Sequence, residues 1–360
     1  MTETSHSHPD GPRAHKTANL ALQGGGAHGA FTWGVLDALL EDGRLRFEGV
    51  SGASAGAMNA VVLAHGLARA HADGLRGQAR NEAARRALTR FWDGVGVIGT
   101  FMSGLPMPGG MQAMMGGWWA QWFSPAQANP LGLNPLRRLI ERQVDFGLLA
   151  HASAQHTGVQ VFVSATNIRT GRGEVFSGQS LTADAVMASA CLPMLFQPVQ
   201  IGGEYYWDGG YSGNPALHPL IYKTASRDVV LVQINPIESP WRPGASAQDI
   251  MERINEITFN ASLLAEMRAI DFVQRLLDEG RLDPARYRSV LLHRVDGGAA
   301  LAQFGAASKM RADAAFLQRL CALGRHAGKA WLAHHWDDLG RQAGVENVES
   351  IESAADGALF

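Results

Sequence analysis

Short apolar runs alternate with stretches of helical periodicity along most of this 360-residue chain. Residues 20–23, 47–50, 159–167 and 228–236 are dense in apolar side chains, which is typical of strands buried on both faces. Residues 27–40 repeat apolar side chains at helical spacing and end near a glycine, as an amphipathic helix does. Because such strands and helices alternate, we expect a three-layer α/β/α fold around a mainly parallel central sheet.

Two long amphipathic helices are predicted in the last third of the chain. The apolar stripe of the first helix consists of Ile250, Ile254, Ile257, Ala261 and Leu264. The stripe of the second helix consists of Phe316, Leu320, Leu323, Ala327 and Trp331. An apolar stripe of this kind usually faces the core, so we expect both helices to pack onto the sheet.

The two ends of the chain fall outside this pattern. We expect residues 1–16 to be a disordered polar tail and residues 341–360 to be a second tail. Residues 17–340 then form a single α/β domain, with its C-terminal helices in about residues 246–340. The first tail lacks the apolar centre of a secretory signal, so we expect a cytoplasmic protein.

One long segment inside the domain carries no charged residue. Residues 94–136 are rich in methionine and tryptophan, but glycines and prolines interrupt them. No unbroken apolar run therefore reaches the ~20 residues that a membrane-spanning helix needs. Two interpretations of this apolar insert stay open: a subdomain packed on the sheet, or a mobile lid that accepts acyl chains or touches a membrane peripherally.

Charge and cysteine content argue against a nucleic-acid partner and against a metal site. The 31 basic and 33 acidic residues give a formal net charge of -2. This balance offers no electrostatic footprint for nucleic acid, and any membrane contact would have to be apolar. Cys191 and Cys321 stand far apart and match no metal or redox spacing, so no metal site is expected.

The stretch "GASAG", residues 52–56, matches the G-x-S-x-G nucleophile elbow. In such an elbow a serine lies on a sharp turn between a strand and a helix, and its hydroxyl is exposed above the sheet. Gly52 and Gly56 are needed because a side chain at either position would collide with a neighbouring element. The alternative is that Ser54 only caps the helix that follows.

A nucleophilic serine needs a base, and "WDGG" supplies a carboxylate in a glycine-rich turn. Asp208, followed by Gly209 and Gly210, could reach Ser54 directly and form a dyad. It could instead orient a histidine in a triad, for which the later candidates are His218, His293, His326, His334 and His335.

The stretch "GGGAHG", residues 24–29, allows two interpretations. Gly24, Gly26 and Gly29 match the dinucleotide fingerprint G-x-G-x-x-G between a strand and a helix. That fingerprint also needs an acidic residue at the end of the next strand, whereas Glu48 begins that strand and Ser54 follows its end. The other interpretation is an oxyanion hole made of backbone N–H groups beside Ser54.

Together, "GGGAHG", "GASAG" and "DGG" resemble the patatin-like phospholipases in order and approximate spacing. The resemblance covers about residues 19–236. It implies a patatin-like fold in which Ser54 is the nucleophile, Asp208 is the general base, and an oxyanion loop is formed by Gly24, Gly25 and Gly26. It also implies that the motifs are supported by Gly29, Gly52, Gly56, Gly209 and Gly210. The family commonly has arginine or lysine where this chain has His28.

These observations predict a serine esterase that needs no cofactor. Its expected substrate is a lipid or another acyl ester, cleaved through an acyl-enzyme by an activity of the phospholipase A or lysophospholipase type. Two alternatives stay open. One is an esterase of soluble short-chain or hydroxyacid oligomer esters, and the other is a dinucleotide-binding protein.

Overall fold

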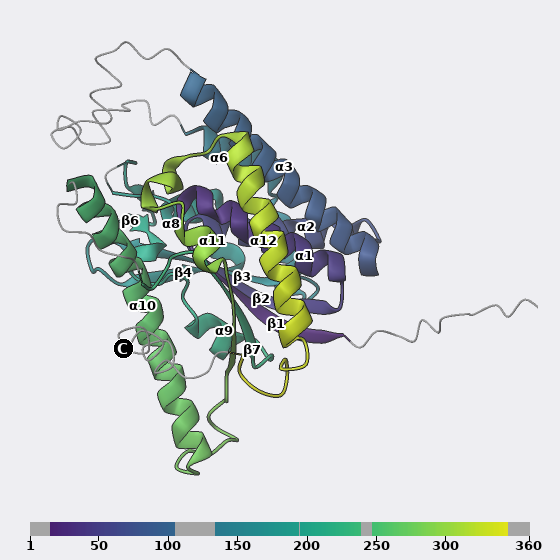
Figure 1. The fold of residues 1–360 in the computed structure, drawn as a ribbon. Coiled ribbons are helices and arrows are strands. Elements are labelled where there is room, and N and C mark those ends of the chain that lie inside the picture. The colour runs from purple at the N-terminus through teal and green to yellow at the C-terminus, as the bar shows by residue number, and fades with distance from the viewer. Residues whose placement is uncertain (1–14, 105–133, 194, 239–246, 345–360) are drawn as a thin grey trace, which may run out of the picture.

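A mixed, mostly parallel sheet forms the centre of the fold (Figure 1). The structure is a computed structural model that describes residues 15–104, 134–193, 195–238 and 247–344. Within these residues the strands run in the order β5-β6-β3-β2-β1-β7-β8, and β4 pairs with β3. The strands are β1 (Lys16–Leu22), β2 (Leu45–Gly52), β3 (Gln160–Asn167), β4 (Gly173–Phe176), β5 (Val199–Ile201), β6 (Glu204–Asp208), β7 (Asp228–Gln233) and β8 (Leu291–Asp296).

Strand directions confirm the predicted fold class. The neighbours β3, β2, β1, β7 and β8 pair in parallel. Strands β4, β5 and β6 pair antiparallel at one side of the sheet. Strand β7 is buried at all positions, as its apolar run predicts for a strand covered on both faces.

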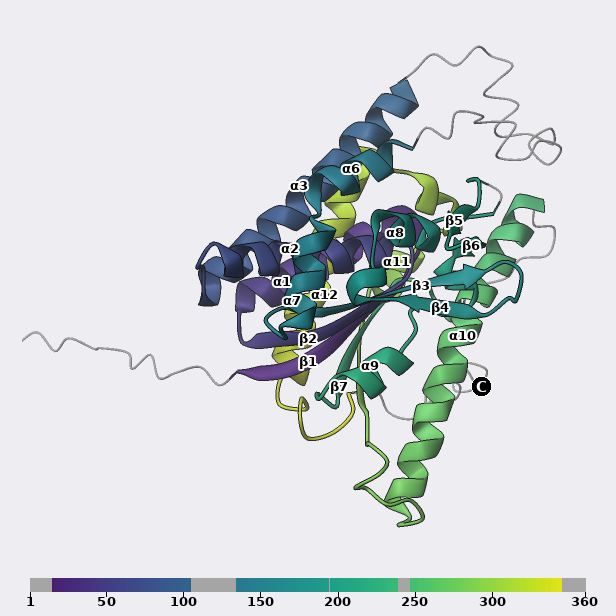
Figure 2. The same cartoon turned by 180° about the vertical axis from the view of Figure 1, so that it is seen from behind.

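Helices cover both faces of the sheet, which gives the expected three layers (Figures 1 and 2). One face carries α1, α2, α3 and α12, and the other carries α9 and α10. The α-helices described are α1 (Gly29–Asp42), α2 (Ala55–Ala72), α3 (Gly77–Gly104), α6 (Pro135–Gln143), α7 (Phe146–Ala154), α8 (Ala183–Ser189), α9 (His218–Lys223), α10 (Ala247–Asp278), α11 (Gly298–Ala302) and α12 (Ala314–His335). The short 3-10 helices are η1 (Gly26–His28), η3 (Gly178–Ser180), η4 (Gly209–Tyr211) and η5 (Ala306–Met310).

The predicted apolar stripe of α12 is confirmed. Phe316, Leu320 and Trp331 are buried, and Leu323 and Ala327 pack against the same core. This stripe lies mainly against α1. The two helices approach backbone to backbone, because a Cβ on Gly324 would lie only 1.9 Å from the carbonyl oxygen of Phe31.

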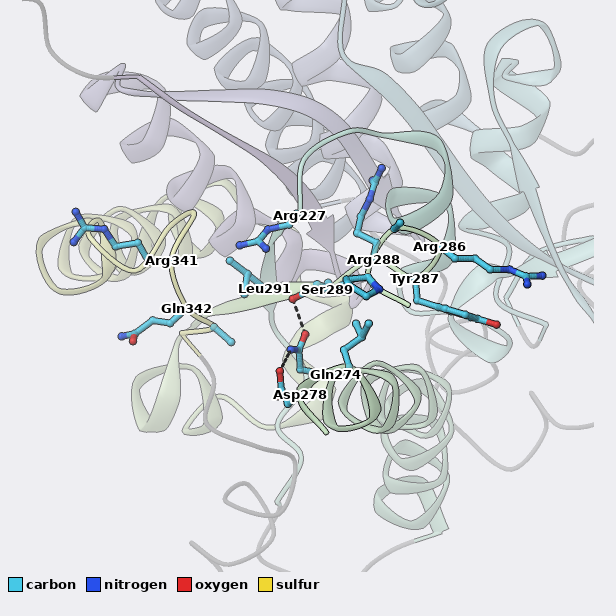
Figure 3. A pocket seen from close by; sticks show the side chains of 15 residues that line it. Arg227, Gln274, Asp278, Arg286, Tyr287, Arg288, Ser289, Leu291, Arg341 and Gln342 are labelled. Carbon is cyan, nitrogen blue, oxygen red and sulfur yellow. Dashed lines mark hydrogen bonds between the residues drawn. The ribbon is translucent and has the colours of Figure 1, made fainter. Parts of the chain in front are cut away.

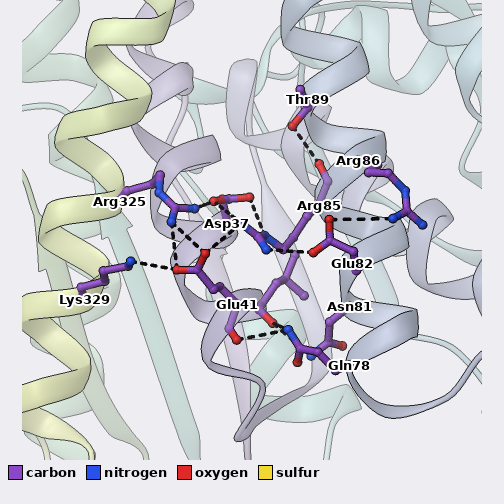
Figure 4. Close-up of polar contacts among 11 residues, drawn as sticks. Asp37, Glu41, Gln78, Asn81, Glu82, Arg85, Arg86, Thr89, Arg325 and Lys329 are labelled. Atoms are coloured by element: carbon purple, nitrogen blue, oxygen red, sulfur yellow. Dashed lines mark hydrogen bonds and ion pairs between the residues drawn. The ribbon is translucent and has the colours of Figure 1, made fainter.

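Charged side chains also join α12 to α1 and α3 (Figure 4). Asp37 of α1 lies between Arg85 of α3, whose Nε is 2.8 Å from Asp37 Oδ1, and Arg325 of α12. Glu41 accepts from Arg325 and from Lys329, with both nitrogens 2.8 Å from Glu41 Oε2. The ion pairs therefore link helices from both ends of the chain.

The predicted apolar stripe of α10 is wrong. Ile250, Ile254 and Ile257 are 44 %, 50 % and 53 % exposed, whereas the buried face carries Phe259, Leu263 and Met267. Two polar side chains, Glu256 and Asn260, share this buried face and find hydrogen-bond partners there. A prediction from apolar periodicity treats polar residues as solvent-facing, so it assigned the buried positions of Glu256 and Asn260 to the surface and the isoleucines to the core.

The apolar insert is described only at its two ends, in residues 94–104 and 134–136. Residues 94–104 complete α3, and the part of the insert up to residue 133 lies outside the described residues, so its packed and lid-like interpretations both stay predictions. Most of both predicted tails also lies outside the described residues. Among the helices that are described, none is long and apolar enough to cross a membrane.

Candidate active site

Three predicted motifs meet near the ends of adjacent strands. Strands β1 and β2 pair in parallel up to Leu22 and Gly52, so the glycine loop after β1 lies beside the turn that contains Ser54. Strand β3 pairs with β2 on one side and with β6 on the other, where Asp208 is opposite Ala165. The topology thereby brings Ser54, Asp208 and the loop together.

Ser54 occupies a strained turn between β2 and α2. Its φ of 54° and ψ of -123° are rarely adopted by a residue with a side chain, and such strain is characteristic of a nucleophile elbow. The side chain makes no capping hydrogen bond to α2, so the alternative role as a helix cap finds no support. The N-terminus of α2 instead directs its positive dipole end toward this turn.

Asp208 is completely buried beside this turn. Its Oδ1 accepts a hydrogen bond of 2.7 Å from the N–H of Gly210, and a hydrogen bond with the Ser54 side chain lowers its pKa. The other oxygen, Oδ2, is buried and has no hydrogen bond of good geometry among the described residues, so the contact with Ser54 is poorly aligned. Burial outweighs both hydrogen bonds and raises the pKa of Asp208 to about 7.

The end of helix α8 holds the backbones of both residues. The N–H of Ser54 donates to Ser189, 2.9 Å from its Oγ and 3.1 Å from its carbonyl oxygen. The N–H of Asp208 donates to the carbonyl oxygen of Cys191 at 2.8 Å. A stretch of three residues therefore fixes where the two turns lie relative to each other.

Motif glycines allow these turns to approach closely. A Cβ on Gly56 would lie 2.1 Å from the Leu22 carbonyl oxygen, and one on Gly209 would lie 2.1 Å from that of Ser164. Contacts shorter than 3.0 Å would also arise from a Cβ on Gly24, Gly29, Gly52 or Gly210. The prediction that side chains would collide at Gly52 and Gly56 is confirmed.

The late histidines lie away from these groups. His293 is buried and bonds to Asp228 at 2.8 Å between β7 and β8. His218 and His326 are exposed, and His334 and His335 bond to neighbours on or just after α12. No hydrogen bond of the described residues joins any of the five to Ser54 or Asp208, so the geometry favours a dyad over a triad.

Hydrogen bonds fix the glycine loop in a way that the motif did not indicate. The N–H of Gly24 donates to Asn214 Oδ1 at 2.7 Å, and its carbonyl oxygen accepts from Asn235 Nδ2 at 2.7 Å. The Gly24 N–H is thus already used, which leaves Gly25 and Gly26 as the candidate oxyanion donors of the predicted three. Gly26 has a φ of 59°, a conformation that favours glycine.

The two loop-holding amides were missed by sequence reasoning. Asn214 follows the "DGG" turn by four residues, and Asn235 comes just after strand β7. Both side chains are almost completely buried, at 0 % and 1 % exposure. A polar residue directly after a buried strand is a signal for such a role, since the ends of parallel strands share one edge.

His28 joins the glycine loop to residues in the C-terminal part of the chain. Its Nε2 lies 2.6 Å from Ser308 Oγ, and its ring packs near Phe304 and Phe316. Burial, with a smaller contribution from Lys309, lowers the pKa of His28 to about 4. The imidazole is therefore neutral at pH 7 and supplies no fixed charge.

The acidic residue considered for a dinucleotide ribose is used elsewhere. Glu48 accepts hydrogen bonds of 2.6 and 2.7 Å from the N–H groups of Ala225 and Ser226. It therefore ties β2 to the loop before β7 and is not available to a nucleotide. The described residues also contain no group of three or more His, Cys, Asp or Glu that could hold a metal ion.

A separate pocket of about 760 Å³ lies away from this site (Figure 3). It is lined in part by Arg227, which precedes β7, and by residues between α10 and β8. Arg288 in this pocket donates to the carbonyl oxygens of Ile221 and Thr224, and Arg286 and Arg341 point outward in Figure 3. The pocket contains neither Ser54 nor Asp208 and has no part in the arrangement described above.

A family model agrees with the motifs. The family model described as "Patatin-like phospholipase" matches residues 20–221. Among solved structures, VipD from Legionella pneumophila is 17% identical, with 90% of this chain and 68% of that chain covered and a TM-score of 0.41. A chain of the ExoU–SpcU complex from Pseudomonas aeruginosa is 19% identical, with 69% and 51% covered and a TM-score of 0.28, so the match spans about half of that chain. No curated protein matches significantly.

Proposed function

The chain belongs to the patatin-like phospholipase family, a family of carboxylic ester hydrolases, and from this premise we propose that it is a lipid acyl hydrolase of the phospholipase A or lysophospholipase type. The observation that carries the proposal is the pairing of Ser54, in its strained turn, with a buried carboxylate whose pKa is about 7. A base is most effective when its pKa lies near the working pH.

In the proposed reaction Asp208 accepts the proton of the Ser54 hydroxyl as Oγ attacks the acyl carbonyl carbon. The N–H groups of Gly25 and Gly26 donate to the oxyanion that forms. When the tetrahedral intermediate collapses, the carbon–oxygen bond of the ester breaks and the leaving alkoxide takes the proton from Asp208. The acyl group stays on Ser54 as an ester.

Water completes the cycle through the same groups. Asp208 accepts a proton from water as the water oxygen attacks the acyl-enzyme carbonyl. The second tetrahedral intermediate collapses, the bond to Ser54 Oγ breaks, and Asp208 returns its proton to that oxygen. The free carboxylic acid leaves, and no cofactor enters any step.

Contact with a membrane is part of the proposal. At the described start of the apolar insert, Val97 is 69 % exposed and Phe101 is 66 % exposed. Such exposed apolar side chains suit peripheral contact with lipid in a protein that stays in the cytoplasm or at a membrane surface.

A fluorophosphonate probe tests the nucleophile. We expect it to label the wild type and not Ser54→Ala. Ser212→Ala is a matched control, since Ser212 follows the Asp208 turn but its hydroxyl bonds to Thr166 at 2.8 Å. Labelling that persists in Ser54→Ala would contradict the proposed nucleophile.

Incubation with a mixed lipid extract then tests the substrate class. We expect release of long-chain fatty acids by the wild type and none by Ser54→Ala. Turnover of short-chain or hydroxyacid oligomer esters alone would assign the soluble-ester alternative. Stabilisation by NAD without labelling would favour a dinucleotide-binding protein.

A further inference from the structure

A segment far outside the family-matched residues contacts the glycine loop. The 3-10 helix η5 contacts η1, which contains part of that loop. A Cβ on Gly26 would lie 2.4 Å from the backbone carbonyl oxygen of Lys309, so this residue packs directly against the loop. Ser308 beside it bonds to His28, as described above. Residues 306–310 therefore pack directly against one side of the glycine loop.

The Lys309 side chain reaches the same loop by a second route. Its Nζ lies 2.9 Å from Asn235 Oδ1 and 3.0 Å from Glu256 Oε1. Asn235 in turn donates through Nδ2 to the carbonyl oxygen of Gly24. An ammonium, an amide and a loop carbonyl are thus connected in series.

The Lys309 ammonium is largely buried, and the removal of a charge from water costs free energy unless an opposite charge compensates it. The Lys309 side chain is 17% exposed and that of Glu256 is 8% exposed. A buried charge must be paired, and Glu256 of α10 supplies the opposite charge. The buried pair explains why Glu256 faces inward on α10, where the sequence pattern predicted a solvent-facing position.

The ammonium also determines how Asn235 is oriented. An ammonium only donates hydrogen bonds, so the amide must present Oδ1 to Lys309 and Nδ2 to Gly24. Polarisation by the positive charge strengthens the N–H donor at the other end of the amide. The position of Gly24 then constrains Gly25 and Gly26, which follow it directly.

We propose that Lys309 is a positioning residue for ester hydrolysis, which holds the glycine loop so that the N–H groups of Gly25 and Gly26 face the reacting carbonyl. It places behind the loop the fixed positive charge that the loop itself lacks, because His28 is neutral. The inference rests on the proposed function, since it assigns a role in the same site.

Steady-state kinetics of Lys309→Met tests the proposal. We expect kcat per active site to fall about 10- to 100-fold, a loss below or equal to that of one oxyanion donor, with KM changed by less than about threefold. Active sites are counted by stoichiometric fluorophosphonate labelling. Lys309→Arg should recover most of kcat, and Lys329→Met, which removes an ion pair to Glu41 on α1, should retain it.

A merely structural role would give another result. It would lower the melting temperature and the fraction of active sites while kcat per site stayed within about threefold of the wild type, and that outcome would overturn the proposal. If Lys309→Met does not fold, Lys309→Gln keeps an N–H donor to Asn235 and removes the charge. An unchanged kcat in that variant would overturn the role of the positive charge, and the Asn235→Ala cycle below then tests the hydrogen-bonded route.

A double-mutant cycle with Asn235→Ala tests the route through the amide. If Lys309 acts through Asn235, the double variant should lose no more kcat than the more impaired single variant. Additive losses would overturn that route. Failure of the wild type to label at Ser54 would instead reject the proposed function, which keeps the two failures distinct.

Discussion

Replacing Asp208 by asparagine should make the folded protein more stable at neutral pH while it abolishes turnover. Burial raises the pKa of Asp208 from 3.8 to about 7. The folded chain therefore binds the proton more tightly than the unfolded chain, and stability is lost as the pH rises from the lower pKa to the higher one. Asparagine has a similar shape and does not titrate, so the variant escapes this loss.

The two pKa values set the size of the effect. The difference between 3.8 and about 7 corresponds to at most about 4 kcal/mol, at 1.36 kcal/mol for each pH unit. Below about pH 4 the carboxyl group is protonated in both states, so wild type and variant differ by a constant offset. Between about pH 4 and pH 7 the advantage of the variant should grow by up to roughly 1.4 kcal/mol per pH unit and then level off.

Urea denaturation of both proteins across this pH range measures the difference in free energy of unfolding. The same substitution at Asp73, an exposed carboxylate after α2, serves as a control for the effect of replacing a carboxylate by an amide. Parallel stability curves for wild type and Asp208→Asn would refute the reasoning, because they would mean that folding leaves the proton affinity of Asp208 unchanged.

Three further outcomes follow from the geometry. Below about pH 7, kcat/KM should rise up to about tenfold per pH unit, and above pH 7 it should be constant, because only the ionised form of Asp208 accepts a proton. A flat profile from pH 5.5 to 8.5 would exclude Asp208 as the base. Gly24→Ala should lower kcat/KM at least about tenfold in ester assays, since the new Cβ would lie 2.6 Å from Ser54 Cβ, and wild-type kinetics would refute that contact. Asp37→Asn should lower the free energy of unfolding by about 1–3 kcal/mol in urea titrations, because Arg85 and Arg325 lose one of the two carboxylates that they share, the other being Glu41. Unchanged stability would show that the ion pairs of Asp37 are energetically neutral.

Apolar runs and short motifs were sufficient to predict the parallel centre of the sheet, β1, β2, β3 and β7, and the meeting of its turns, but not the antiparallel strands or β8. Strands buried on both faces are recognisable by an apolar run at their centre, as at residues 229–232 of β7. The "GASAG" and "DGG" motifs mark tight turns, where close backbone contacts require glycine, as at Gly56 and Gly209. Such local constraints are visible in the sequence.

Long-range polar pairs were not predictable in the same way. The inward face of α10 includes Glu256 and Asn260, whose partners Lys309 and Gln23 lie far away in the chain. Without those partners the side chains look solvent-facing, and the isoleucine stripe looks buried. The use of the Gly24 N–H by Asn214 also depends on a contact between residues 190 positions apart.

The three residues at the end of α8 have a mechanical consequence. Ser189 and Cys191 accept hydrogen bonds from the backbone N–H groups of Ser54 and Asp208. A tilt or slide of α8 would therefore move the hydroxyl and the carboxylate together. Thermal motion of the surrounding helices would then shift both side chains together relative to the N–H groups of the glycine loop, before it changed the distance between Ser54 and Asp208.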